Sequence, residues 1–151
     1  MAQSDLTLFN EHINSLGDGV YALDADTIRV AIIDSVQTPA ATSSDPRWGA
    51  GGGTNFDTDE VTEGGGNYAL EGIDILATWS ESAGVGTFDA TDITTWTQNA
   101  SNPVDARWLI IYDDTVAGNQ CIGYVDLGSI FDMTTGDLNV TWNASGIFTI
   151  S

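Results

Sequence analysis

The strongest indication of the fold is the segment Arg107-Trp108-Leu109-Ile110-Ile111-Tyr112. Successive side chains of an extended strand point to opposite faces of a sheet, so Trp108, Ile110 and Tyr112 share one face while Leu109 and Ile111 share the other. Both faces are therefore apolar. A strand of this kind is buried on both sides, so the sequence predicts that this segment is a central strand of a covered sheet.

Short strand-like segments recur along the chain on both sides of this stretch. They are rich in β-branched and aromatic residues, and their spacing is close to that of sandwiches and barrels. The predicted strands lie at 28–33, within 68–79, at 85–88, at 93–96 and at 121–127. We therefore predict an all-β fold, a β-sandwich or jelly-roll-like antiparallel domain.

The C-terminal segment shows a cleaner alternation. Leu138, Val140 and Trp142 alternate with polar residues, as a half-buried strand requires. Residues 143–146, Asn-Ala-Ser-Gly, are typical of a turn and lead into Ile-Phe-Thr-Ile at 147–150. This order predicts a terminal hairpin.

A short N-terminal helix is predicted within residues 1–17. Ser4 is placed to cap it and Gly17 to end it. Its apolar positions recur at three- and four-residue steps: Leu6, Phe9, Ile13 and Leu16. This spacing places His12 on the exposed side of the helix. The apolar stripe can pack on the core of its own subunit or contact a neighbour.

Residues 38–67 are rich in Gly, Thr, Ser, Asp and Asn and predict a long Gly-rich loop region. Two aromatic residues, Trp48 and Phe56, are the candidate partner-binding residues of this loop. An aromatic side chain in a polar loop either folds back to hold the loop or anchors an interface. We expect a single β-domain, 1–151, whose main strand-rich part is 68–151.

The charge balance is strongly acidic. The chain has 22 Asp and Glu against three Arg and no Lys, for a formal net charge of -19. Such a field repels phosphate, so we expect no nucleic-acid or anionic-membrane partner. A salt-rich habitat or selection for solubility would give the same composition. The first ten residues lack the basic flank and apolar run of a signal peptide, and no apolar run is long enough to span a membrane.

Few residues suit catalysis or tight metal binding. The chain has one His and one Cys, His12 and Cys121, and we interpret Cys121 as a buried hydrophobe on a strand. Calcium could use the oxygen-rich runs at 57–60 or 113–114, although neither fits an EF-hand loop. We predict no catalytic residue, no cofactor and no specific metal site. The tryptophans within strand patterns are assigned to the core: Trp79, Trp96, Trp108 and Trp142.

Six stretches, taken in order, resemble a family of small decoration, or cement, proteins of tailed-phage heads. They are DTIRVAI at 26–32, NYALEG at 67–72, FDATDI at 88–93, RWLIIYDD at 107–114, IGYVDLG at 122–128 and LNVTWNASGIF at 138–148. The resemblance implies a non-enzymatic virion protein on the outer surface of the head, bound to the major capsid protein as a homotrimer. No fixed motif aligns over the Gly-rich stretch at 49–66.

Two other functions fit the same composition. A phage tail or head-fibre component would share the fold and touch the host surface instead of the shell. A carbohydrate-binding module would stack sugar rings on exposed aromatic side chains, and it predicts that Trp48 or Phe56 is exposed.

Overall fold

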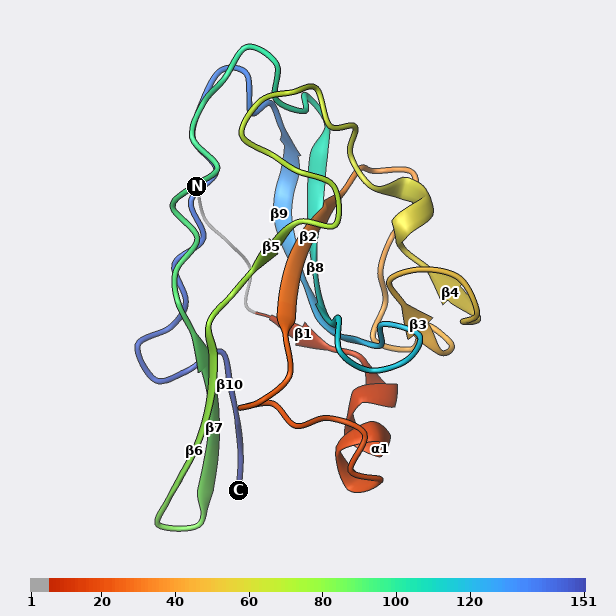
Figure 1. Ribbon diagram of the computed structural model, residues 1–151, viewed down its shortest axis with the longest axis vertical. Helices are drawn as coiled ribbons and strands as arrows, with labels where there is room; N and C mark the ends of the chain where they lie inside the picture. The colour runs from red at the N-terminus through yellow and green to blue at the C-terminus, as the bar shows by residue number, and fades with distance from the viewer. Residues whose placement is uncertain (1–5) are drawn as a thin grey trace.

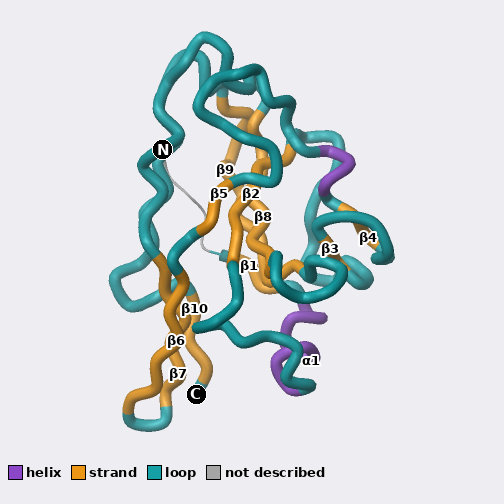
Figure 2. Tube along the Cα trace, in the orientation of Figure 1, coloured by secondary structure: helices purple, strands orange, loops and turns teal. Residues whose placement is uncertain are grey.

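The computed structural model describes residues 6–151 (Figure 1). In this part of the chain strands and loops predominate, with one α-helix, α1 (Asn10–Gly17), and one 3-10 helix, η1 (Asp57–Asp59). The strands form sheets of five, three and two strands (Figure 2). The predicted all-β class is confirmed. No helix within residues 6–151 has the length and apolar character needed to cross a membrane.

The five-stranded sheet forms the centre of the molecule. Its order is β1-β9-β8-β2-β5 and all its pairings are antiparallel. The strands are β1 (Thr7–Leu8), β2 (Ile28–Ile33), β5 (Ile73–Asp74), β8 (Ala106–Asp113) and β9 (Cys121–Phe131). The segment at 107–112, apolar on both faces, lies in β8, and β8 is the middle strand, as predicted.

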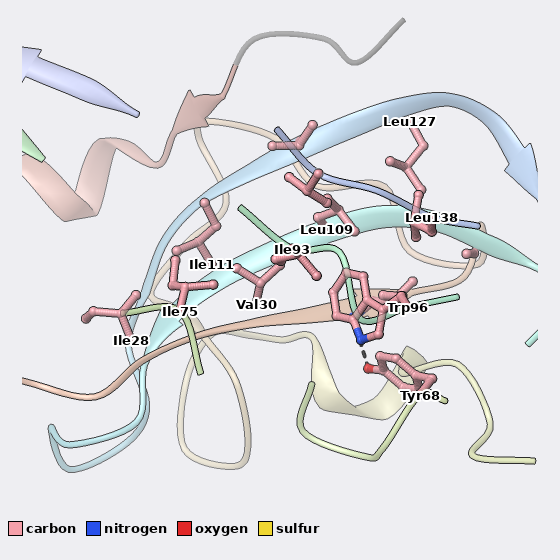
Figure 3. Close-up of a cluster of buried hydrophobic side chains, with 14 of the residues drawn as sticks. Ile28, Val30, Tyr68, Ile75, Ile93, Trp96, Leu109, Ile111, Leu127 and Leu138 are labelled. Atoms are coloured by element: carbon pink, nitrogen blue, oxygen red, sulfur yellow. Dashed lines mark hydrogen bonds between the residues drawn. The ribbon is translucent and has the colours of Figure 1, made fainter. Parts of the chain in front are cut away.

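The two faces of this sheet bury two separate clusters of side chains. Leu109 and Ile111 of β8 join the first cluster, which we call the inner core (Figure 3). Trp108, Ile110 and Tyr112 join the second, the outer core. The alternation predicted for β8 is confirmed. Fully burying a side chain of this size stabilises the fold by about 1.5–3 kcal/mol, so the strand contributes from both sides.

The three-stranded sheet has the order β10-β7-β6, with β6 (Ala77–Ser82), β7 (Val85–Ala90) and β10 (Phe148–Ile150). A two-residue turn joins β6 to β7; its residues Ala83 and Gly84 both have positive φ, 51° and 83°. This is the backbone form favoured in tight hairpins. Phe88 of β7 belongs to the inner core, and the Phe148 ring stacks on it at 5.0 Å between centroids.

The predicted terminal hairpin is wrong. β10 pairs with β7, and the segment before the turn lies beside residues 93–96 instead. Val140 forms a bridge with Ile93, and the Leu138 N–H donates to the carbonyl of Trp96. The alternation itself is correct, because Leu138 and Val140 are buried in the inner core. A local turn sequence does not determine which strand receives the chain after the turn.

Residues 38–67 contain no strand of the two larger sheets (Figure 1). Trp48 and Phe56 of this region belong to the outer core, whereas Val61 belongs to the inner core. The region includes a small parallel pair, β3 (Pro46–Arg47) with β4 (Thr54–Asn55), followed by η1. The polar composition did not reveal this pair, since both strands are only two residues long.

The helix starts later than predicted. Ser4 lies outside the described residues, and residues 7 and 8 form β1 on the edge of β9 before α1 begins at Asn10. The end at Gly17 agrees with the prediction. Phe9 and His12 are fully buried whereas Ile13 is 64% exposed, so the assignment of His12 to the exposed side is wrong. The pairing of β1 with β9 determines where the helix begins, and the resulting orientation of the helix places His12 on its buried side.

Candidate functional site

Trp48 and Phe56 hold the loop region onto the sheet. Trp48 is 3% exposed and stacks nearly parallel on Tyr112, with ring centroids 5.1 Å apart. Phe56 is fully buried and stacks on Phe9 at 5.6 Å. Of the two alternatives drawn from the sequence, the structure has the one in which the aromatics hold the loop. The exposed ring that the carbohydrate-binding function requires of Trp48 or Phe56 is contradicted.

Backbone contacts fix the same loop further. The Trp48 N–H donates to Asn119, the Phe56 N–H donates to Arg47, and the Val61 N–H donates to Ile32 of β2. Gly118 packs so closely on the Arg47 guanidinium that a Cβ at that position would clash with it. The part of the loop that carries Trp48 and Phe56 is therefore packed over the outer core, and Val61 connects the loop to β2.

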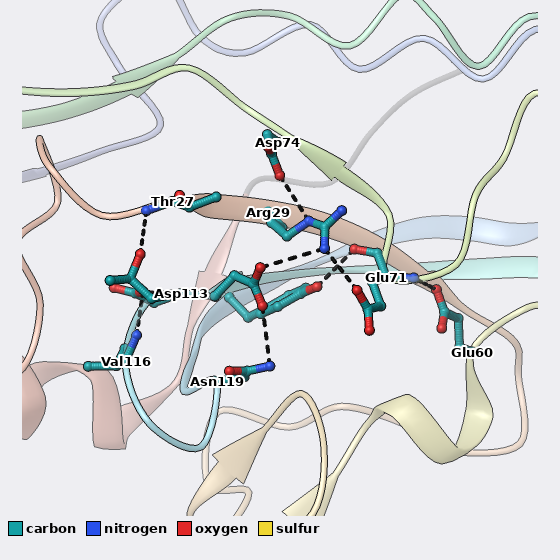
Figure 4. Close-up of polar contacts among 11 residues, drawn as sticks. Thr27, Arg29, Glu60, Glu71, Asp74, Asp113, Val116 and Asn119 are labelled. Atoms are coloured by element: carbon teal, nitrogen blue, oxygen red, sulfur yellow. Dashed lines mark hydrogen bonds and ion pairs between the residues drawn. The ribbon is translucent and has the colours of Figure 1, made fainter.

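Arg29 gathers carboxylates from three parts of the chain (Figure 4). Its guanidinium lies 3.1 Å from Glu71, 2.9 Å from Asp74 and 3.6 Å from Asp114. Glu71 comes from the turn before β5, Asp74 from β5 itself, and Asp114 directly follows β8. Each exposed pair contributes little alone, about 0–1 kcal/mol, but one cation here connects three segments.

Glu60 closes the adjoining turn. Its carboxylate accepts hydrogen bonds from the Tyr68 hydroxyl at 2.7 Å and from the Glu71 N–H. The Tyr68 hydroxyl in turn accepts from the Ile32 N–H at 3.0 Å. Burial raises the pKa of Glu60 and also that of Tyr68. This arrangement connects the Gly-rich loop to β2.

Asp113 is fully buried at the end of β8. One carboxylate oxygen accepts the N–H groups of Thr115 and Val116, at 2.8 and 3.1 Å. The other has no hydrogen-bond partner among the described residues. The pKa of Asp113 is raised to about 6, chiefly by burial; the two backbone hydrogen bonds lower it and the neighbouring carboxyl of Asp26 raises it.

His12 is buried among rings. The imidazole lies 5.0 Å from the Tyr21 ring and 5.4 Å from Phe148, between centroids, and neither nitrogen has a hydrogen-bond partner among the described residues. Burial lowers its pKa to about 4. The imidazole is therefore neutral near pH 7 and serves as a packing group between α1 and β10.

The remaining candidates for chemistry are the thiol of Cys121 and the acidic runs considered for calcium. Cys121 is 1% exposed, and burial raises the pKa of its thiol, which disfavours the nucleophilic thiolate. Within residues 6–151, no three His, Cys, Asp or Glu side chains are grouped so that they could hold a metal ion. Of the two runs considered for calcium, 57–60 forms η1 and its cap, and in 113–114 Asp114 faces Arg29.

A groove of about 550 Å³ lies beside the C-terminal segment. Leu6, Val125 and residues of the 141–149 segment line it. The indole N–H of Trp142 donates to the carbonyl of Thr91, which fixes the orientation of this ring. The lining is chiefly hydroxyl, amide and aromatic groups, so a ligand there would be held by hydrogen bonds and ring packing.

Comparison with known proteins finds no matching family model, no matching curated protein and no matching solved structure.

Proposed function

We propose that this chain is a non-enzymatic structural protein of a tailed-phage particle, a decoration protein that binds the outside of the head and stabilises the shell. Its partner is the major capsid protein, and the decorating unit is a homotrimer. The proposal includes a jelly-roll-like arrangement of the two larger sheets.

The observation that carries the proposal is where the resembling segments lie. Three of the six stretches, 26–32, 107–114 and 122–128, fall on β2, β8 and β9, which are adjacent strands of the central sheet. A resemblance in framework strands concerns the fold as a whole, whereas a resemblance in one loop would concern a local motif. It therefore supports a shared architecture with decoration proteins.

The placement of reactive groups agrees with a role in adhesion. His12, Cys121 and Asp113 are all buried and packed. The net charge of -19 suits a position outside the shell, because the same field would be repelled by packed DNA within. Many copies on a closed shell turn weak contacts into strong overall attachment by avidity.

The decisive experiment mixes the purified protein with undecorated phage heads and measures co-sedimentation. We expect saturable binding, with a fixed number of copies for each capsid subunit. Heads that already carry their full set of decoration protein are the matched control and should take up none. Undecorated heads that take up none at any protein concentration would contradict the proposal.

A tail or head-fibre component is the remaining alternative within the same class. Labelled antibodies on purified particles separate the two, because a decoration protein marks the whole head and a fibre marks the tail or isolated spikes. A label confined to the tail would favour the fibre.

A further inference from the structure

Within residues 6–151, the outer strand of the three-stranded sheet has an unpaired edge. β6 ends the order β10-β7-β6, and its backbone hydrogen bonds with another strand are those to β7. The hairpin of β6 and β7 extends beyond the five-stranded sheet, at the lower left of Figure 1. The edge is therefore open to another chain.

The hairpin geometry determines which groups the edge presents. In a hairpin with a two-residue turn, the pair flanking the turn exchanges backbone hydrogen bonds, and so does every second pair from there. Ser82 pairs with Val85 across the turn. The alternate residues of β6 therefore direct their N–H and C=O groups away from β7; these are Ala77, Trp79 and Glu81.

This edge lacks the usual protection against strand pairing. Exposed edges are normally interrupted by a bulge, Pro, Lys or several charges. β6 pairs with β7 over six consecutive residues without a register shift, and its sequence, ATWSES, contains one charged residue. The rest of the chain has 21 further acids. The strand is a regular and weakly charged edge on a strongly acidic molecule.

We propose that β6 pairs antiparallel with β6 of a second copy of this chain. The register that places Trp79 opposite Trp79 of the second copy engages all three outward residues of each strand. It sets Glu81 opposite Ala77, so no carboxylate on one strand faces a carboxylate on the other. The two three-stranded sheets then become one continuous sheet of six. A basic peptide partner fits less well, because this edge offers it one acid.

The contact is isologous, since the same strand serves both copies. It joins copies in pairs and is therefore additional to any contact within a trimer. The inference does not depend on the proposed function, because it concerns the isolated protein in solution.

Cross-linking tests the register. Residues 78 and 80 of opposite copies form a pair without backbone hydrogen bonds, whose Cα atoms lie about 4.5 Å apart, within the range of a disulfide. The variant T78C/S80C should form a covalent pair of chains on mild oxidation. Thr87→Cys, on β7 and away from the edge, should form none.

Sedimentation velocity over a range of concentrations tests the association itself. As the protein concentration rises, the average mass should increase from that of the smallest species to twice that value. The increase should occur at lower protein concentration in about 1 M salt than in about 0.1 M salt, because screening reduces the repulsion between two acidic copies. Thr78→Asp with Ser80→Asp sets like charges opposite each other and should abolish the doubling. Thr62→Asp with Ser129→Asp adds the same charge at exposed positions elsewhere and should leave it intact.

Glu81→Pro provides an independent variant, since it removes an outward N–H without removing a bond to β7. It should also prevent the doubling, with an unchanged circular dichroism spectrum as the check on folding. A mass that never doubles, or a doubling that survives both edge variants, would overturn the inference. The inference would also be overturned if the edge variants abolished binding to phage heads without changing the mass, because β6 would then pair with a shell protein and not with a second copy.

Discussion

His12 shows how one buried side chain can make stability depend on pH. The imidazole lies between Tyr21 and Phe148 with its pKa lowered to about 4, against 6.5 when solvated. Between these values the unfolded chain binds the proton and the folded chain does not. The contribution of His12 to stability is therefore complete above pH 6.5 and is lost as the pH falls toward 4.

Replacing this residue by His12→Phe should remove that loss. The difference in the free energy of unfolding between pH 7 and pH 4 should shrink by about 3 kcal/mol, the equivalent of the pKa shift. Urea unfolding of both proteins at the two pH values measures it. An unchanged difference would mean that the imidazole is solvated in the folded state.

Asp113 acts in the opposite direction. Its pKa is raised from 3.8 to about 6, so between these values the folded chain holds the proton more tightly than the unfolded chain does. The carboxyl favours folding at low pH, and this contribution is lost as the pH rises through 6. Asp113→Asn stays neutral, and its carbonyl can still accept from Thr115 and Val116.

We expect Asp113→Asn to stabilise the protein by about 1–3 kcal/mol at pH 7 and to have little effect at pH 4. Thermal unfolding at both pH values tests this. Asp114→Asn is the matched control, because it loses an ion pair with Arg29 and should not stabilise at pH 7. Destabilisation by Asp113→Asn at pH 7 would contradict the assigned environment.

Among the elements, the loop at 38–67 depends on a few aromatic contacts. Trp48→Ala removes the ring that stacks on Tyr112 and should cost about 3–5 kcal/mol of folding free energy. Trp142→Ala, at the half-buried wall of the groove, should cost less. Urea unfolding ranks the two. A Trp48 variant of normal stability would mean that this ring does not hold the loop.

The elements also show which parts of the fold can be predicted from the sequence. The central position of β8 could be predicted, because an apolar pattern on both faces leaves only a central position in a sheet, and β2 could be predicted as a strand from its β-branched residues. The start of α1 and the partner of β10 could not, since both depend on pairing with β9 and β7, far along the chain. The role of Trp48 likewise depends on Tyr112, a contact between residues distant in sequence. The β6 edge becomes visible only once the strand order is known.

For the whole molecule, the net charge of -19 opposes compaction. Raising sodium chloride from about 0.1 M to about 1 M shortens the screening length from about 10 Å to about 3 Å. The same salt weakens the ion pairs of Arg29, which are exposed and individually weak. We therefore expect the thermal midpoint to rise by a few degrees. A falling midpoint in differential scanning calorimetry would show that ion pairs outweigh the repulsion.

The central pair of strands joins distant parts of the chain, since Ile28 of β2 pairs with Asp113 of β8. During synthesis β2 leaves the ribosome long before its neighbour exists. Closing so large a loop is slow, and such topologies fold on the scale of milliseconds to seconds. The apolar segment of β2 is therefore exposed until β8 has been synthesised. The dense negative charge of the chain opposes aggregation during this interval, because like-charged chains repel one another.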